Sequence, residues 1–292
     1  MGSELLKHRL LCGFVCALSL LALAGGISNA RSQQPRVLLG CTGTIKDIGP
    51  VKAAGFDYIE LNTTEFAALS EDDFAKLQTT LKQSGIPVYA TSNFLPASIK
   101  LTGPAVDPDA EMAYVRKAFA RASLLGSHYM IFGSGASRTV PVGFSHDVAF
   151  GQLVDFCKRI APEARAKGII VAIEPQSLDQ SNIINGTAEG MKLLDAVNDP
   201  NVQLVLDIYY LDQLHEDPAE MIAIKQHIVH FHFSNPDGRV FPARWEEYKY
   251  GPFFAALRKM SYAGAISIDA HAKDFATEGP LAVAFLRDAL SR

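Results

Sequence analysis

Cysteine is scarce in this chain, with four cysteines among 292 residues. Two of them, Cys12 and Cys16, lie within the first thirty residues, which leaves Cys41 and Cys157 for a folded domain. So few cysteines exclude a small fold held together by disulfides, and a domain of this length does not need one. We expect Cys41 and Cys157 to be small buried residues, although Cys41 lies at a strand end and could instead line a site.

An excess of charge of either sign is also missing. Lysine and arginine total 27 against 31 aspartates and glutamates, which gives a net charge of −4 and a pI near 6.1. This balance gives no basis for a nucleic-acid partner or for binding to an anionic membrane. The chain also lacks internal repeats, low-complexity tracts and linkers, and its composition is that of an ordinary globular protein. One domain therefore accounts for it.

The one long hydrophobic run lies at the N-terminus. Lys7 and Arg9 precede the apolar run LLCGFVCALSLLALAGG at residues 10–26, and SNA at residues 28–30 is a small-x-small cleavage site. We predict a signal peptide at residues 1–30 and an exported protein, periplasmic or secreted, without stable membrane insertion after cleavage. The alternative is a retained anchor helix, but the run is short for a membrane span and no lipoprotein-like cysteine follows it.

Strand-like and helix-like segments alternate from residue 37 onward. The strand-like segments are short apolar runs of the kind found in buried parallel sheets: VLLGCTG, FDYIELN, PVYATSNF, HYMIFGSG, IIVAIEPQS, VQLVLD, IVHFHFSN and AISIDAH. Eight strand–helix units in about 260 residues are typical of an α/β fold of the (β/α)8 TIM-barrel type. We therefore predict a single barrel domain at residues 31–292.

The main alternative fold is an open, doubly wound sheet that binds a dinucleotide. Such a site requires a glycine-rich turn after the first strand, and none is present there. The run GSGASR at residues 133–138 follows the fourth strand and leads into a proline-containing loop. We interpret this run as a flexible loop at the mouth of the barrel.

Helices are predicted between the strands, and glycine ends two of them. EDDFAKLQTTLKQSG stops at Gly85 and DAEMAYVRKAFARASLLG stops at Gly126, because glycine readily adopts the left-handed conformation that terminates a helix. Further helices are expected at about residues 45–54, 146–167, 186–198, 245–261 and 278–291.

Four of the predicted strands end on side chains that bind metals. Glu174, Asp207 and Asp269 each follow an apolar run directly, and IVHFHF carries two histidines. The carboxyl ends of barrel strands meet at one face, where the active sites of this fold lie. Side chains alternate along a strand, so His230 and His232 point the same way, with His232 nearer the mouth and His230 one layer deeper as a hydrogen-bonded core residue. The pattern predicts a metal centre, although each carboxylate taken singly could be a helix cap or a surface ion-pair partner.

Several motifs make the chain resemble a known superfamily. GFDYIEL, VAIEPQ, PNVQLVLDIYYL, HFHFSNPDGR and YAGAISIDA occur in the order and spacing of the xylose isomerase-like barrels. More closely, the chain resembles the sugar phosphate isomerase/epimerase branch, which includes ketose 3-epimerases and hydroxypyruvate isomerases. The resemblance implies one divalent metal ion held by Glu, Asp, His and Glu. The matching positions are Glu174, Asp207, His232 and Asp269, with an aspartate in place of the second glutamate.

The resemblance also implies roles in catalysis and substrate binding. Glu174 and Asp269 would move the proton beside the substrate carbonyl. The predicted substrate-binding residues are Tyr210, Arg239, Gln176 and His271. Tyr210 stands where the family has a substrate-binding histidine. Three further positions depart from the charged or polar residues of the family: Ser177, Leu178 and Gln180. These departures indicate a rebuilt substrate pocket.

The implied chemistry is removal of a proton next to a sugar carbonyl, which creates an enediolate that a divalent cation stabilises. Oxygen ligands with one imidazole suit Mn²⁺, Mg²⁺, Co²⁺ or Zn²⁺. We expect a sugar isomerase or epimerase acting on a non-phosphorylated sugar or sugar derivative, since phosphorylated sugars are scarce outside the cytoplasm. The alternatives are a lyase or hydratase acting on a keto-sugar or 3-keto-glycoside, and a sugar-binding barrel without turnover. Homo-oligomerisation stays open. An abasic-site endonuclease of the same fold needs many more histidines and a basic groove, which this sequence lacks.

Overall fold

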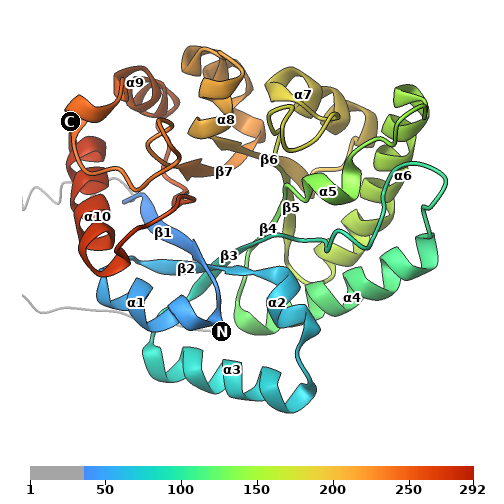
Figure 1. Cartoon of the computed structure of the whole chain (residues 1–292), viewed down its shortest axis with the longest axis horizontal. Coiled ribbons are helices and arrows are strands. Elements are labelled where there is room, and N and C mark those ends of the chain that lie inside the picture. The colour runs from blue at the N-terminus through green and yellow to red at the C-terminus, as the bar shows by residue number, and fades with distance from the viewer. Residues whose placement is uncertain (1–35) are drawn as a thin grey trace, which may run out of the picture. The chain divides into compact units, whose positions relative to one another are not determined.

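The computed structural model describes residues 36–292, so the predicted signal peptide lies outside the described residues. Eight parallel strands close into a barrel in chain order, with β8 paired to β1, and helices surround the strands (Figure 1). The predicted (β/α)8 fold is therefore confirmed. Among the described residues, no helix is both long enough and apolar enough to cross a membrane.

The strands of the barrel are short, and their register sets the level of each inward-facing side chain. The strands are β1 (Leu38–Gly43), β2 (Tyr58–Asn62), β3 (Val88–Ser92), β4 (Tyr129–Phe132), β5 (Ile170–Ile173), β6 (Val202–Asp207), β7 (Ile228–Phe233) and β8 (Ala265–Ile268). Asp207 pairs with His232, and His232 pairs with Ser267. Because directly paired residues point to the same face of a sheet, these three side chains face the barrel interior together.

Two connecting helices end at the glycines that the sequence indicates. α3 (Glu71–Ser84) stops at Gly85 with φ 66°, and α4 (Pro108–Leu125) stops at Gly126 with φ 90°. The other helices of the described residues are α1 (Ile48–Ala53), α2 (Thr63–Ala68), α5 (Gly135–Arg138), α6 (His146–Arg165), α7 (Gly186–Val197), α8 (Ile208–Gln213), α9 (Gly251–Met260) and α10 (Phe275–Ser291), with the 3-10 helices η1 (Ile45–Asp47), η2 (Pro218–His227) and η3 (Trp245–Glu247).

Several connections differ from the sequence prediction. The helix expected at residues 245–261 is divided into η3 and α9, and α10 begins before residue 278 because Asp274 caps it. The short helices α2 and α8 follow β2 and β6 without a loop and were not predicted. Their N-caps are Asn62 and Asp207, whose side chains accept the backbone N–H groups of Glu65 and Tyr209. A polar residue at a strand end therefore also starts the next helix here.

The interior of the barrel contains both apolar and polar side chains. One small buried cluster is apolar and is formed by Ile131, Ala172 and Val205. A second set is polar and equally buried: Tyr58, Glu60, His230 and Ser267. Polar groups in such a place cost free energy unless they are hydrogen-bonded. This polar set lies beneath the residues that the sequence assigns to the metal centre.

Candidate active site

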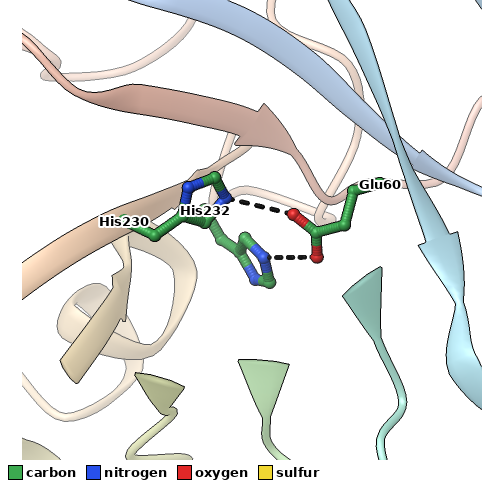
Figure 2. A group of neighbouring side chains, drawn as sticks. All are labelled: Glu60, His230 and His232. Atoms are coloured by element: carbon green, nitrogen blue, oxygen red, sulfur yellow. Dashed lines mark hydrogen bonds and ion pairs between the residues drawn. The ribbon is translucent and has the colours of Figure 1, made fainter. Parts of the chain in front are cut away.

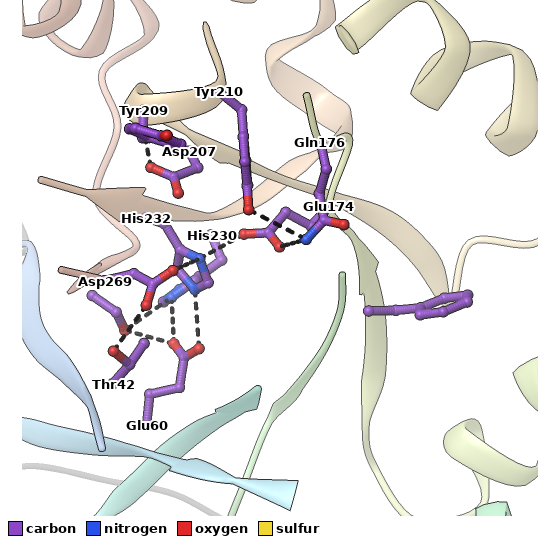
Figure 3. A network of polar contacts seen from close by, with 12 residues as sticks. Thr42, Glu60, Glu174, Gln176, Asp207, Tyr209, Tyr210, His230, His232 and Asp269 are labelled. Carbon is purple, nitrogen blue, oxygen red and sulfur yellow. Dashed lines mark hydrogen bonds and ion pairs between the residues drawn. The ribbon is translucent and has the colours of Figure 1, made fainter. Parts of the chain in front are cut away.

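The four predicted metal ligands converge at the mouth of the barrel, where β5 to β8 end (Figure 3). One ligand atom from each of Glu174, Asp207, His232 and Asp269 lies within 4.8 Å of the others. His232 Nδ1 is 2.8 Å from Glu174 Oε1 and 3.7 Å from Asp269 Oδ2. Three of the four side chains are buried, and Asp269 is partly exposed. The fold thus gathers the predicted ligands into one site.

These residues fit a divalent cation. Three carboxylates and one imidazole form a donor set that the four candidate metals accept. Burial raises the pKa of Asp207 to about 7, even though the neighbouring Arg239 opposes the rise. Asp269 and Glu174 add to the rise, because a third negative charge in the same buried space is unfavourable. A cation placed among these carboxylates would relieve that repulsion.

Arg239, a predicted substrate-binding residue, contacts two carboxylates of the candidate metal site. One of its terminal nitrogens donates to Asp207 Oδ2 at 3.0 Å and to Asp269 Oδ2 at 2.5 Å. The other donates to the Tyr210 hydroxyl at 3.2 Å, and the guanidinium lies over the rings of Tyr209 and Tyr210. The backbone of Arg239 is left-handed, with φ 50°. Arg239 is therefore held beside the candidate metal site by two ion pairs and two aromatic rings.

Glu60 is a site residue that the sequence prediction missed. Its carboxylate accepts hydrogen bonds from both histidines of β7, at 3.0 Å from His232 Nε2 and 3.1 Å from His230 Nε2 (Figure 2). Ser267 Oγ donates to the same carboxylate at 2.6 Å. Burial opposes ionisation of Glu60, but His232 and His230 outweigh it and hold the pKa of that carboxyl well below its usual range. The prediction that His230 is a deeper, hydrogen-bonded core residue is confirmed.

Glu60 fixes the orientation of the His232 ring through Nε2. Nδ1 faces Glu174 and Asp269 and is the atom that would bind a metal ion, while the carboxylate of Glu60 would hold the proton on Nε2. The signal for Glu60 was visible in the sequence, since FDYIELN carries a carboxylate at a position that faces the barrel interior. Sequence alone does not say which residues of other strands surround it.

We expect Glu60→Gln to weaken metal binding about 10- to 100-fold, because the amide no longer fixes the His232 ring with a charge-assisted hydrogen bond. Calorimetric titration of the metal-free protein with Mn²⁺ measures the change. The exposed Glu220→Gln variant is the control, and thermal unfolding checks that both variants fold. An unchanged Mn²⁺ dissociation constant would contradict the orienting role.

The run 133–138 lies at the mouth of the barrel, as predicted, but it ends in the short helix α5 rather than forming a loop throughout. Arg138 at the end of α5 is buried, and its guanidinium donates to the backbone oxygen of Glu174 at 2.8 Å and to Gln176 Oε1 at 3.3 Å. Gln176 in turn donates to Glu174 Oε2 at 3.0 Å (Figure 3). A Cβ at Gly133 would lie 2.4 Å from Glu174 Oε2, so the glycine is needed for this close approach. Arg138 and Gln176 therefore support Glu174.

A cavity of about 490 Å³ opens above these residues. Its walls include most of the predicted site residues: Glu174, Gln176, Tyr210, His232, Arg239, Asp269 and His271. Asp207 lies beneath Arg239 instead. The side-chain oxygens of Asp269 accept hydrogen bonds from Arg239 and, at 3.0 Å, from Thr42 Oγ1. Gln180 lines the cavity as well, whereas Leu178 is exposed.

The two cysteines of the described residues, Cys41 and Cys157, are buried, as expected, and form no disulfide.

The chain belongs to the xylose isomerase-like TIM barrel family, whose model matches residues 48–289. The membership that the motifs suggested is thus confirmed. A probable ketose 3-epimerase of Synechocystis sp. is 26% identical over 226 residues, which is 75% of each chain. An L-ribulose 3-epimerase of Methylomonas sp. is 25% identical over 240 residues, which is 80% of each chain.

Solved structures of the same fold are also similar to this chain. A D-psicose 3-epimerase, determined in the presence of D-fructose, superposes with a TM-score of 0.77 at 19% identity, over 88% of this chain and 100% of that one. A 3-keto-D-glucoside 4-epimerase from E. coli superposes with a TM-score of 0.74 at 16% identity, over 87% of this chain and 100% of that one. At such identities the likeness establishes the fold.

Proposed function

We propose that this protein is a divalent-metal-dependent epimerase or isomerase of a non-phosphorylated sugar or sugar derivative. Its relatives assign it to the sugar isomerases and epimerases. The observation that carries the finer proposal is the placement of two carboxylates, Glu174 and Asp269, beside His232 Nδ1 in one cavity. Two such groups can act as base and acid on one bound substrate.

Glu174 is suited to the role of the base. Burial alone would raise its pKa, but His232 and Arg239 lower the pKa below its ordinary value, so the carboxylate is charged at neutral pH. Gln176 holds one of its oxygens at 3.0 Å. A charged and oriented carboxylate can take the proton from the carbon beside a sugar carbonyl. A divalent cation held by the four ligands would stabilise the negative charge that then develops.

Asp269 is placed to return a proton. Thr42 Oγ1 and Arg239 fix the position of its carboxyl group. It approaches His232 from the side of β8, whereas Glu174 approaches from the side of β5 (Figure 3). Proton removal by one carboxylate and proton return by the other, from different sides of the substrate, inverts a carbon centre.

The cavity offers little to a phosphate group, which supports a non-phosphorylated substrate. Among the described residues that line it, Arg239 is the only lysine or arginine. The Arg239 charge is already paired with Asp207 and Asp269. A phosphate dianion in this cavity would meet carboxylates rather than free cations.

A lyase or hydratase acting on a keto-sugar is the second candidate. The contacts of Asp269 favour it, because Arg239 and Thr42 already donate to both carboxylate oxygens, the atoms that would have to carry a proton. Glu174 would then act as the sole base, with a leaving group on the neighbouring carbon. The same site without turnover would be a sugar-binding barrel.

Proton exchange in deuterated water distinguishes these functions. Metal-loaded protein is incubated with free ketoses and with 3-keto-glucosides, and the products are analysed by NMR and mass spectrometry. We expect deuterium in a recovered stereoisomer, which identifies epimerisation. Loss of water or of the aglycone would identify the lyase or hydratase, and absence of exchange with every sugar would contradict both and leave a binding protein. Metal-free protein is the control.

Export is also a proposal, and it rests on the pattern of residues 1–30 alone. Mass spectrometry of the N-terminus of the natural protein tests this proposal. A start near Arg31 would support signal cleavage, and an intact Met1 would contradict it.

A further inference from the structure

A second hollow adjoins the active-site cavity. It measures about 680 Å³ and shares three wall residues with that cavity, namely Gln180, Arg239 and His271. Its other walls come from α8, from the loop after β7, and from η3 and the residue that follows it. Each hollow alone is in the size range of small-molecule sites. The two hollows therefore lie next to each other, and Arg239 lines both of them.

The loop after β7 separates the two hollows, and backbone bridges hold it in place. Asn235 and Val240 form an antiparallel bridge, and Val240 forms a second bridge with His271. The backbone N–H of His271 donates to the Arg239 oxygen at 2.8 Å. Gly238 and Arg239 are both left-handed, with φ 80° and 50°, which turns the loop back toward β6 and β8. The loop that delivers Arg239 to the active site thus also forms a side of the second hollow.

The chemistry of the second hollow suits a neutral, polyhydroxylated ring. Two tyrosines, Tyr209 and Tyr248, supply aromatic surface, and three carboxylates, Asp212, Asp237 and Glu247, supply hydrogen-bond acceptors. Of the residues in the described part of the chain, Arg239 is the only lysine or arginine in these walls, and its charge is already paired with carboxylates. The excess of acceptors disfavours an anion.

Two of these carboxylates are held in place. Glu247 Oε1 accepts the backbone N–H groups of Ala243 and Arg244, at 2.5 Å and 3.1 Å, and Asp212 accepts the Tyr248 hydroxyl. Each of these carboxylates has a second oxygen, which can accept the hydroxyl group of a ligand. Anchored acceptors beside an aromatic ring are a pre-organised site for a sugar, since little side-chain entropy is lost on binding.

We propose that the second hollow is a subsite for the second ring of a glycoside whose reacting ring lies beside Glu174 and Asp269. This inference rests on the proposed function and narrows its substrate class to keto-glycosides of two rings. The reacting ring carries the carbonyl next to the abstracted proton. The second ring contributes binding through Tyr209, Tyr248 and the carboxylates, and takes no part in the chemistry.

The test compares a two-ring substrate with a one-ring substrate. Metal-loaded protein is given a 3-keto-disaccharide of glucose or methyl 3-keto-glucoside in deuterated water, and kcat/KM for deuterium incorporation is measured. We expect the two-ring substrate to be preferred at least about tenfold, with most of the difference in KM, because a hydrogen bond to a charged acceptor contributes about that factor. Equal kcat/KM values would overturn the subsite.

Variants of the second hollow sharpen the test. Asp212→Asn and Asp237→Ala should each lower the ratio of two-ring to one-ring kcat/KM by about tenfold. Asp237 is exposed, so its replacement does not endanger folding. Asp195→Ala, an exposed aspartate on α7 outside both hollows, is the matched control and should leave the ratio unchanged. If neither Asp212→Asn nor Asp237→Ala lowers the ratio of two-ring to one-ring kcat/KM, the proposal is contradicted.

Failure of the proposed function is a separate outcome. If no substrate exchanges deuterium, calorimetry with cellobiose and methyl β-glucoside still reports on the subsite. Tighter binding of cellobiose, lost in Asp237→Ala, would support the second-ring site in a protein without turnover. Equal binding of the two probes would overturn the subsite as well.

Discussion

Asp207→Ala is expected to abolish stoichiometric metal binding and to lower turnover by at least about 10³-fold. Asp207 is the most enclosed of the four ligands, since Arg239 lies against its carboxylate at 3.0 Å and the side chain is fully buried. Its loss removes one ligand directly. The substitution also leaves Asp269 as the remaining carboxylate partner of Arg239. Asp269, a second predicted ligand, is then drawn further into its ion pair with Arg239.

Elemental analysis after dialysis against Mn²⁺ measures the metal content of this variant. Asp195→Ala, on the exposed face of α7, is the control for a general effect of removing an aspartate. Asp207 also caps α8 by accepting the Tyr209 N–H at 3.0 Å, so thermal unfolding must accompany the measurement. A folded Asp207→Ala protein that keeps a full equivalent of metal would rule the site out.

Asp269→Asn should lose both metal affinity and turnover, by roughly 10² to 10³-fold in rate. The amide keeps the size of the side chain but removes the charge that pairs with Arg239 and that would bind the metal. The hydrogen bond from Thr42 is retained in an amide, which makes the variant close to isosteric. Calorimetry and deuterium incorporation measure the two losses separately.

Asp269→Glu tests whether Asp269, which is one methylene shorter than glutamate, binds the metal ion directly or only through a bridging water. An extra methylene moves the carboxylate by about 1.5 Å, and a displacement of that order can change a rate about 10²-fold. We expect direct ligation by Asp269, because its Oδ2 lies 3.7 Å from His232 Nδ1 and its carboxylate is held there by Arg239 and Thr42. Asp269 lines the cavity, which leaves room for the longer glutamate. The glutamate should then be tolerated or raise epimerisation. Wild-type turnover in Asp269→Asn would remove Asp269 from the mechanism and favour the one-base lyase.

The barrel and the predicted ligands could be derived from the sequence, because both are encoded locally. Alternating apolar runs and helices specify parallel strands, and in such a barrel the carboxyl ends of all strands meet at one face. Glu174, Asp207 and Asp269 each stand directly at such an end. The period of two along β7 was enough to place His232 above His230.

The partners of these residues could not be derived, because they come from distant parts of the chain. Glu60 lies 170 and 172 residues from the two histidines that it joins. Arg138 was concealed by a glycine-rich run whose conformation depends on close packing against Glu174. The helices α2 and α8 start from residues that the sequence shows only as strand ends.

The sequence by itself therefore determined the fold class, the face of the barrel that carries the site, and the residues brought together there. Only the tertiary structure decided what each of them contacts. Strand and helix patterns depend on neighbours a few residues apart, which the sequence displays. The Glu60–His232 pair, the position of Arg239 between Asp207 and Asp269, and the second hollow depend on the closure of the barrel and on loop packing, which no local pattern records.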